Sequence, residues 1–202
     1  MKIALVSREF PPHPQAGGIA TYTEKTARGL ATAGHEVHVF TEMCPGADGY
    51  PGLAGVRLHR LPNPRVRPRE ARLLRRAIDV ARAIRHEAPF DIVQACEWEG
   101  EASVYALSPA APLLTRLATP RYLVNALNQA SPAMRRRCVV QAGLERWQTR
   151  RSTRIVSPSQ ALADVVARDW RIAMDRIVVV PTGIEPPRVD PAAVLPARLT
   201  NR

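Results

Sequence analysis

The stretch Arg8-Glu9-Phe10-Pro11-Pro12-His13-Pro14-Gln15-Ala16-Gly17-Gly18-Ile19 joins a short apolar run to a segment with helical periodicity. The run Ile3 to Val6 predicts a buried strand, and Ile19 to Ala33 predicts a helix. In an open α/β sheet, a loop in this position lies at the edge where ligands bind. Gly17 and Gly18 let the backbone approach a ligand closely, and the free N–H groups of the first helical turn favour an anion such as phosphate. The pair is equally compatible with a plain turn, because one Gly-Gly pair is a weak signal.

Strand and helix patterns alternate along the rest of the chain. Apolar runs predict strands over residues 36–40, 56–60, 90–95, 112–117, 154–156 and 176–180, and helical spacing predicts helices over 69–86, 102–107 and 132–151. Another helix is expected after Ser157 as N-cap, with Pro158 at its first position and Gln160 closing a capping box, and it ends near Trp170. This alternation predicts an α/β fold, an open parallel sheet with helices on both faces.

Composition limits the chain to a few classes of protein. Its 202 residues suffice for one well-buried domain, and 29 Lys and Arg against 18 Asp and Glu give a net charge of +11, which permits an acidic partner. Aromatic residues make up only 5%, so nucleic acid is a minor alternative that rests on charge alone. Cys44, Cys96 and Cys138 lack metal-ligand spacing, which favours free thiols in a reducing compartment and no metal site. Without a signal-peptide core or an apolar run of about 18 residues, we expect a cytoplasmic protein.

The helix expected over 69–86 is amphipathic and basic. One side is apolar and includes Leu73, Leu74 and Ala77, and the other side contains Arg69, Arg72, Arg75, Arg76 and Arg82. Most such faces are simply solvated. The same face also fits a peripheral contact with the anionic inner face of a membrane, so both interpretations stay open.

Three carboxylates follow the strand expected over 90–95. Glu97, Glu99 and Glu101 lie beside Trp98 at its carboxyl end, on the same edge of a parallel sheet as the glycine pair. They form either a polar site or the acidic N-terminus of the helix over 102–107, which the helix dipole favours. We assign Glu99 and Glu101 to the helix start and leave Glu97 open between the two interpretations.

Four stretches point to a known family by their order and spacing. They are Phe10-Pro11-Pro12 with Gly17-Gly18-Ile19; Gly34-His35-Glu36-Val37 with Val39; Phe90-Asp91-Ile92-Val93 with Glu97-Trp98; and Ile155-Val156-Ser157-Pro158-Ser159 with Arg176-Ile177 and Pro181-Thr182-Gly183-Ile184. In these stretches the chain resembles the N-terminal half of the retaining, nucleotide-sugar-dependent glycosyltransferases of family 4. Such enzymes have the GT-B fold, in which two Rossmann-like domains face each other.

The resemblance implies a role for each part of the chain. Residues 1–186 would form the Rossmann-like domain that binds a sugar or lipid acceptor, residues 187–202 would be a linker or tail, and the C-terminal donor domain would be absent. A nucleotide-diphosphate sugar would be the co-substrate, with no further cofactor. Gly17 and Gly18 would approach its pyrophosphate, where backbone N–H groups stabilise the charge on the departing diphosphate.

The chain departs from the family pattern at one position of the candidate site. Members of the family often have a histidine after the strand that reads Thr115-Arg116-Leu117 here, and this chain has Ala118 in that place. A methyl group can neither position nor polarise an acceptor hydroxyl. The resemblance therefore implies either an engineered or degenerate site, or an acceptor handled by other groups, with Arg116 and Glu97 as the candidates.

Two functions follow from these observations. The first is the acceptor-binding domain of a glycosyltransferase, inactive without a donor domain, which the glycine pair favours. The second is a catalytically dead module that binds a sugar or phosphate ligand, or a partner subunit of a split transferase, which Ala118 favours.

Overall fold

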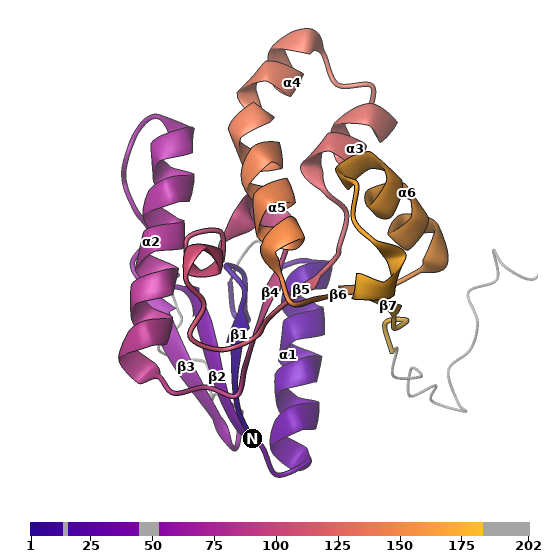
Figure 1. Cartoon of the computed structure of the whole chain (residues 1–202). Coiled ribbons are helices and arrows are strands. Elements are labelled where there is room, and N and C mark those ends of the chain that lie inside the picture. The colour runs from indigo at the N-terminus through magenta and orange to yellow at the C-terminus, as the bar shows by residue number, and fades with distance from the viewer. Residues whose placement is uncertain (14–15, 45–52, 184–202) are drawn as a thin grey trace, which may run out of the picture.

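The computed structural model describes residues 1–13, 16–44 and 53–183, and within them one parallel sheet organises the chain. The expected tail over 187–202 and most of the loop after residue 44 lie outside the described residues. The sheet has seven strands in the order β3-β2-β1-β4-β5-β6-β7 (Figure 1). The strands are β1 Lys2–Val6, β2 Glu36–Glu42, β3 Val56–Leu61, β4 Ile92–Cys96, β5 Leu113–Arg116, β6 Arg154–Ser157 and β7 Ile177–Val179. The predicted α/β fold is therefore confirmed.

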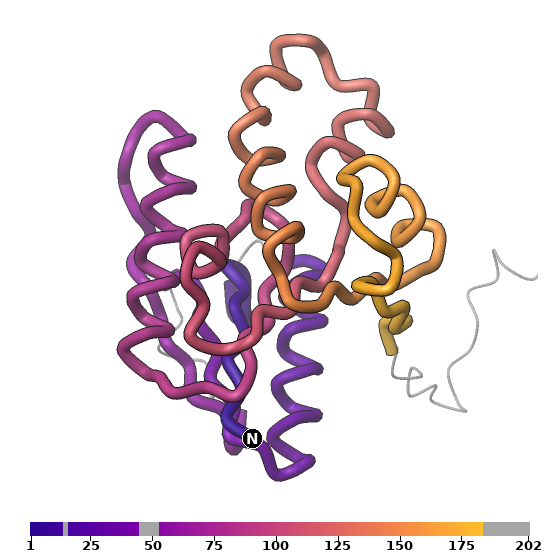
Figure 2. The backbone as a smooth tube through the Cα atoms, viewed as in Figure 1, coloured from indigo at the N-terminus to yellow at the C-terminus, as the bar shows by residue number. Residues whose placement is uncertain are grey.

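Six α-helices and three short 3₁₀ helices connect the described strands. The α-helices are α1 Gly18–Thr32, α2 Arg69–Glu87, α3 Arg121–Leu127, α4 Pro132–Arg137, α5 Val139–Arg151 and α6 Gln160–Trp170. The 3₁₀ helices are η2 Trp98–Gly100, η3 Tyr105–Leu107 and η4 Met174–Arg176. Helices α3 to α5 form an excursion that rises away from the sheet and returns to it before β6 (Figure 2).

Helices cover both faces of the sheet, as the alternation of strand side chains requires. On one face, Leu5 and Val39 pack with Ala27 of α1. On the opposite face, Ala4 and Val93 pack with Val80 of α2. Successive residues of the central strands β1, β2 and β4 thus contribute to two apolar layers, and burial of both layers is the main driving force for folding.

Helices α5 and α6 extend the layer that α2 begins. Thr115 in β5 accepts a hydrogen bond from Gln148 of α5, and its register partner Ile155 packs with Val166 of α6. On the α1 side of β5–β7, no helix among the described residues covers the strands, and Val178 of β7 is 49% exposed. Among the described helices, α1 therefore covers this face mainly at β1 to β4, and its Tyr22 reaches Arg116 at the end of β5.

Helix boundaries differ from the sequence prediction at two places. The helix predicted over 132–151 is divided at Cys138 into α4 and α5, and α3 before it was not predicted. The N-cap of α6 is Ser159, whose hydroxyl accepts from the Leu162 N–H at 3.3 Å, and not Ser157. Ser157 ends β6 and donates its hydroxyl hydrogen to the Ser159 carbonyl, because a residue still paired in the sheet cannot also cap the helix.

The helix predicted over 102–107 does not form, and the two glutamates assigned to its start have another role. Residues 97–108 contain only 3₁₀ turns, and Glu99 and Glu101 are buried. Glu101 accepts a hydrogen bond from Arg76 at 2.9 Å, which corrects the prediction that Arg76 lies on an exposed basic face. A buried carboxylate needs a buried counter-charge, so Arg76 turns inward while Leu74, predicted to be buried, is 43% exposed.

Gly100 allows α5 to pack directly on the β4–β5 connection. Its φ is +62°, and a Cβ built on it would lie 2.6 Å from the Leu144 Cβ and 2.8 Å from the Leu144 carbonyl carbon. Both the left-handed backbone and the contact with a helix backbone therefore require glycine here.

We predict that Gly100→Ala destabilises the fold by about 2 to 4 kcal/mol, because it adds backbone strain to overpacking. Urea unfolding followed by circular dichroism measures this change. Gly143→Ala on α5 is the matched control, since its Cβ would meet nothing within 4 Å, and it should be neutral or slightly stabilising. Equal unfolding midpoints for the Gly100→Ala variant and the wild type would contradict the close packing.

Candidate functional site

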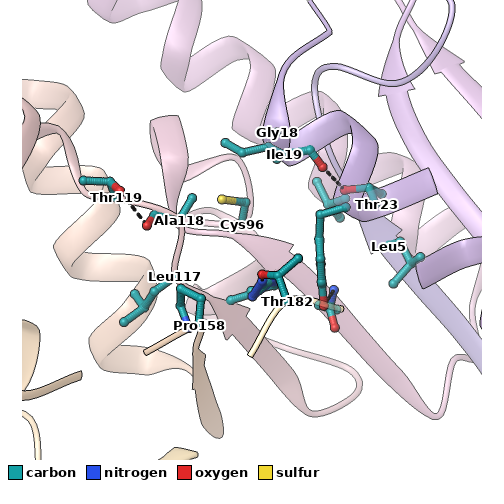
Figure 3. Close-up of a pocket in the computed structure, with 14 residues that line it drawn as sticks. Leu5, Gly18, Ile19, Thr23, Cys96, Leu117, Ala118, Thr119, Pro158 and Thr182 are labelled. Carbon is teal, nitrogen blue, oxygen red and sulfur yellow. Dashed lines mark hydrogen bonds between the residues drawn. The ribbon is translucent and has the colours of Figure 1, made fainter. Parts of the chain in front are cut away.

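A cavity lies at the carboxyl edge of the sheet, where the strand order reverses between β1 and β4. Its volume is about 380 Å³. Its lining comprises Leu5 and Val6 of β1; Gly18, Ile19, Tyr22 and Thr23 of α1; Gln94 and Cys96 of β4; Arg116 to Thr119 at the end of β5; Pro158; and Thr182. We call it the switch-point cavity, because ligands of open α/β sheets bind where the strand order reverses. Figure 3 shows Gly18 and Ile19 across the cavity from Leu117 and Pro158.

The two glycines differ in their relation to the switch-point cavity. Gly18 is the first residue of α1 and lines the cavity, whereas Gly17 is the N-cap with extended backbone, φ −114°, and lies outside the lining. A Cβ on Gly18 would meet nothing within 4 Å, and neither residue has a positive φ. No side chain caps the N-terminus of α1, and its first turn contains no acidic residue. Neither packing nor backbone conformation thus explains a glycine at position 18, while space beside the helix N-terminus is open for an anion.

Arg116 forms one wall of the switch-point cavity and is 7% exposed. Its guanidinium lies 3.6 Å above the centre of the Tyr22 ring, and its Nη2 donates a hydrogen bond to the Thr182 hydroxyl. Its Nη1 is buried and has no hydrogen-bond partner in the part of the chain that the structure describes. Stacking on an aromatic face fixes the orientation of the guanidinium.

Glu97 lies beneath the cavity lining. Its Oε2 accepts hydrogen bonds from the Ala118 N–H at 2.7 Å and from the Cys96 thiol at 3.0 Å. Its Oε1 is buried without a partner among the described residues. Burial raises the pKa of Glu97 to about 7, since an apolar environment disfavours the charged form. The side chain thus holds the segment that contains Ala118 in place from below.

Sequence reasoning missed several lining residues. Tyr22 lies four residues after Gly18 and thus on the same face of α1, a helical spacing that was available in the sequence. Gln94 follows Val93 in β4, and successive side chains of a strand point to opposite faces. Because Val93 packs in the layer on the α2 side, Gln94 faces the cavity. Thr182 follows β7, and no local pattern indicates that its hydroxyl reaches Arg116. Ala118 does line the cavity, as its place after β5 suggests.

One group of side chains with metal-ligand chemistry lies on the α2 side of the sheet. Among the described residues, His38, His59 and Glu87 have donor atoms within 4.8 Å of one another. The two imidazoles share a hydrogen bond of 2.9 Å, and the Glu36 carboxylate accepts a hydrogen bond from the other nitrogen of His38 at the same distance. Hydrogen bonds within the chain therefore account for the buried His38 ring without an ion.

Comparison with protein families finds one match. The sequence profile of Glycosyltransferase Family 4 matches residues 16–188, which include every lining residue from Gly18 to Thr182. No curated protein matches the chain in sequence.

The chain is similar in fold to solved structures of about twice its length. Sucrose-phosphate synthase from Thermosynechococcus elongatus is 17% identical with a TM-score of 0.68, covering 89% of this chain and 47% of its own. Starch synthase IV from Arabidopsis thaliana, bound to ADP and acarbose, is 12% identical with a TM-score of 0.62, covering 91% and 51%. HepE from Anabaena, in complex with UDP, is 14% identical with a TM-score of 0.59, covering 92% and 45%. The chain spans about half of these structures, as expected for one Rossmann-like half of a GT-B fold.

We predict that Glu97 makes stability depend on pH. Because its pKa is raised from 4.5 to about 7, its contribution is fully present below pH 4.5 and is lost as pH rises through 7. The loss is about 3 kcal/mol at most for a shift of this size. Glu97→Gln should therefore flatten the decline in unfolding free energy between pH 5 and 8, measured by urea titration at each pH.

The matched control for that titration is Asp164→Asn, which removes an exposed carboxylate of α6 and should keep the wild-type slope. Glu145 contributes to the same slope in all three proteins, because burial raises its pKa to about 7 as well. Parallel curves for Glu97→Gln and the wild type would show that Glu97 titrates normally.

Proposed function

This chain belongs to glycosyltransferase family 4, and we propose that it is the acceptor-binding N-terminal domain of a retaining, nucleotide-sugar-dependent transferase. The observation that carries this proposal is the switch-point cavity, where Gly18 at the start of α1 meets Arg116 and Ala118 at the end of β5. The uncapped N-terminus of α1 borders this cavity, and polar side chains form part of its wall. Such a site suits two substrates that meet at its opening.

The donor diphosphate would lie at the N-terminus of α1. Open space beside Gly18 lets phosphate oxygens reach the free N–H groups of the first turn, which stabilise the charge that develops as the sugar leaves. The acceptor would occupy the interior beside Gln94 and Thr119, whose polar groups can bind hydroxyls. The proposed substrates are accordingly a nucleotide-diphosphate sugar and a sugar or lipid acceptor, and the proposed location is the cytoplasm.

Most of the donor site would belong to a second Rossmann-like half, in the same polypeptide or in a partner. The chain covers 47% of sucrose-phosphate synthase, and the domain alone would hold one substrate without aligning the other. Alignment of two reactants contributes a large part of the rate enhancement of group transfer. We therefore propose that residues 1–202 alone transfer no sugar.

Ala118 favours a second function, a catalytically dead binding module or a subunit of a split transferase. Ala118 lines the cavity where members of the family often have a histidine, and Glu97 Oε2 is occupied by the Ala118 N–H. Transfer by a protein that includes both halves supports the enzyme. Ligand binding without transfer by the same protein supports the binding module.

A peripheral contact with an anionic membrane is proposed for the carboxyl edge at β2 and β3. No described helix combines the length and apolarity needed to cross a bilayer. An open groove of about 1160 Å³ at this edge is lined by Met43, Asn63, Pro64, Arg65, Val66, Arg67, Pro68, Arg69 and Arg72. Exposed Met43 and Val66 beside several arginines are suited to a surface with anionic headgroups. This groove replaces the basic face predicted for α2, because Arg76 is buried and Arg75 pairs with Asp79.

For the glycine loop, we predict that Gly18→Ala lowers sugar transfer by about a hundredfold in a protein that includes both halves, because the methyl group blocks the diphosphate. Its unfolding free energy should change by less than about 0.5 kcal/mol, since the added Cβ meets no protein atom. Gly29→Ala, on the same helix but outside the cavity, is the control and should keep full activity. Unchanged transfer by the Gly18→Ala variant would show that the diphosphate does not bind beside Gly18.

For the basic groove, we predict that joint replacement of Arg65, Arg67 and Arg72 by glutamine lowers binding to phosphatidylglycerol-containing vesicles by about a hundredfold at low salt. Each arginine near such a surface contributes on the order of 1 kcal/mol. Co-sedimentation measures the change. Replacement of Arg135, Arg136 and Arg137 on exposed α4 removes the same charge and should have little effect. Equal losses for the two triple variants would indicate net charge rather than this groove.

A further inference from the structure

The buried arginines of the described chain differ in their partners. Arg76 is 4% exposed and pairs with Glu101 at 2.9 Å. Arg8, which is partly buried, pairs with Glu99 at 2.7 Å. Arg116 is 7% exposed, and among the described residues no carboxylate lies within ion-pair distance of it. A buried charge without a counter-charge is unfavourable, so an arginine kept in this state points to a partner from outside the chain.

The surroundings of Arg116 hold its guanidinium toward the switch-point cavity without neutralising it. Tyr22 supports one face of the guanidinium at 3.6 Å, and the Thr182 hydroxyl accepts from Nη2. Neither group is an anion. Nη1 retains an unused donor although it is shielded from bulk water. An oxyanion in the cavity would supply both the missing hydrogen-bond acceptor and the missing negative charge.

We propose that the ligand of the switch-point cavity has an anionic group, a phosphate or a carboxylate, and that Arg116 binds this group. The inference rests on the proposed function only in taking a substrate as the occupant of the cavity. A planar guanidinium stacked on Tyr22 is pre-oriented for two parallel hydrogen bonds to such a group. The Thr182 hydroxyl and the Gln94 side chain, which also line the cavity, are neutral and accommodate the rest of the ligand.

In a transferase, an anionic group in the cavity belongs either to the acceptor or to the diphosphate of the donor. Gly18 and the free N–H groups of α1 lie at the helix N-terminus, whereas Arg116 lies beside Tyr22, one turn further along α1. The two anion-binding features thus come from different elements, α1 and β5, and each can be substituted separately. This separation lets experiment assign the anion to one substrate.

The test is isothermal titration of the full chain with inorganic phosphate, glucose 6-phosphate, glucose and UDP, at constant ionic strength. For the wild type, we expect glucose 6-phosphate or UDP to bind at least tenfold more tightly than glucose. Arg116→Gln should weaken the binding of phosphate and of the anionic ligand at least tenfold. Arg116→Lys should weaken their binding less, because lysine keeps the positive charge but lacks the paired donors of the planar guanidinium. Arg82→Gln, on the exposed side of α2, is the matched control and should bind as the wild type.

Thermal unfolding separates binding from a structural role. Removal of an unpaired buried charge should leave the melting temperature of Arg116→Gln equal to or above that of the wild type without ligand. If Arg116→Gln weakens the binding of glucose 6-phosphate more than that of UDP, the anionic group belongs to the acceptor. If it weakens the binding of UDP more, the anionic group belongs to the donor. Equal phosphate binding by Arg116→Gln and the wild type overturns the proposal, as does tight binding of glucose alone. None of these readouts requires sugar transfer, so an inactive domain leaves the test intact.

Discussion

The hydrogen bonds that Glu145 accepts from two backbone N–H groups hold the carboxyl edge of the sheet in shape. Glu145 binds the Glu99 N–H at 3.0 Å through one oxygen and the Arg121 N–H at 2.7 Å through the other. Glu99 lies in η2 after β4 and Arg121 is the first residue of α3 after β5, and N–H groups in the first turn of a helix have no acceptor within that helix. A buried N–H without a partner is strongly unfavourable, so a side chain from α5 completes both connections.

The rest of the edge follows from that attachment. One turn after Glu145, Gln148 accepts from the Ala102 N–H and donates to the Cys96 carbonyl, both at 2.8 Å, so a polar stripe of α5 lies along the whole β4–β5 connection. This stripe explains why the buried side of α5 is polar, with Gln141, Glu145, Gln148 and Thr149, rather than apolar. Glu97, at the start of the connection, then fixes the Ala118 N–H and with it one wall of the switch-point cavity. The cavity is thus shaped by backbone positions that buried polar side chains hold, rather than by an apolar core.

Local patterns predicted the sheet and the residues at its edge, and they failed where long-range pairing overrides local preference. Apolar runs are sufficient for parallel strands, since both faces are buried, and the position of Gly18 at the sheet edge follows because carboxyl ends of parallel strands meet. Arg116 and Ala118 were singled out through the family resemblance instead. Arg76 was misplaced because its partner, Glu101, is 25 residues away and has no helical spacing to reveal the pair. The helix over 102–107 was predicted from apolar spacing, but side chains of α5 satisfy that backbone instead. Neither effect is visible in a short sequence window.

The same buried network leaves the switch-point cavity electropositive. Arg76 neutralises Glu101, and Arg8 and Arg69 surround Glu99, so these carboxylates do not oppose Arg116. Glu97 donates its backbone N–H to the Arg116 carbonyl, and burial raises the pKa of its carboxyl to about 7, so a large part of it is protonated at neutral pH. An anion that binds Arg116 favours that protonated form further, because it adds negative charge nearby. Anion binding and the proton on Glu97 are therefore thermodynamically linked, and affinity for the anion should decline as the carboxyl ionises above neutral pH.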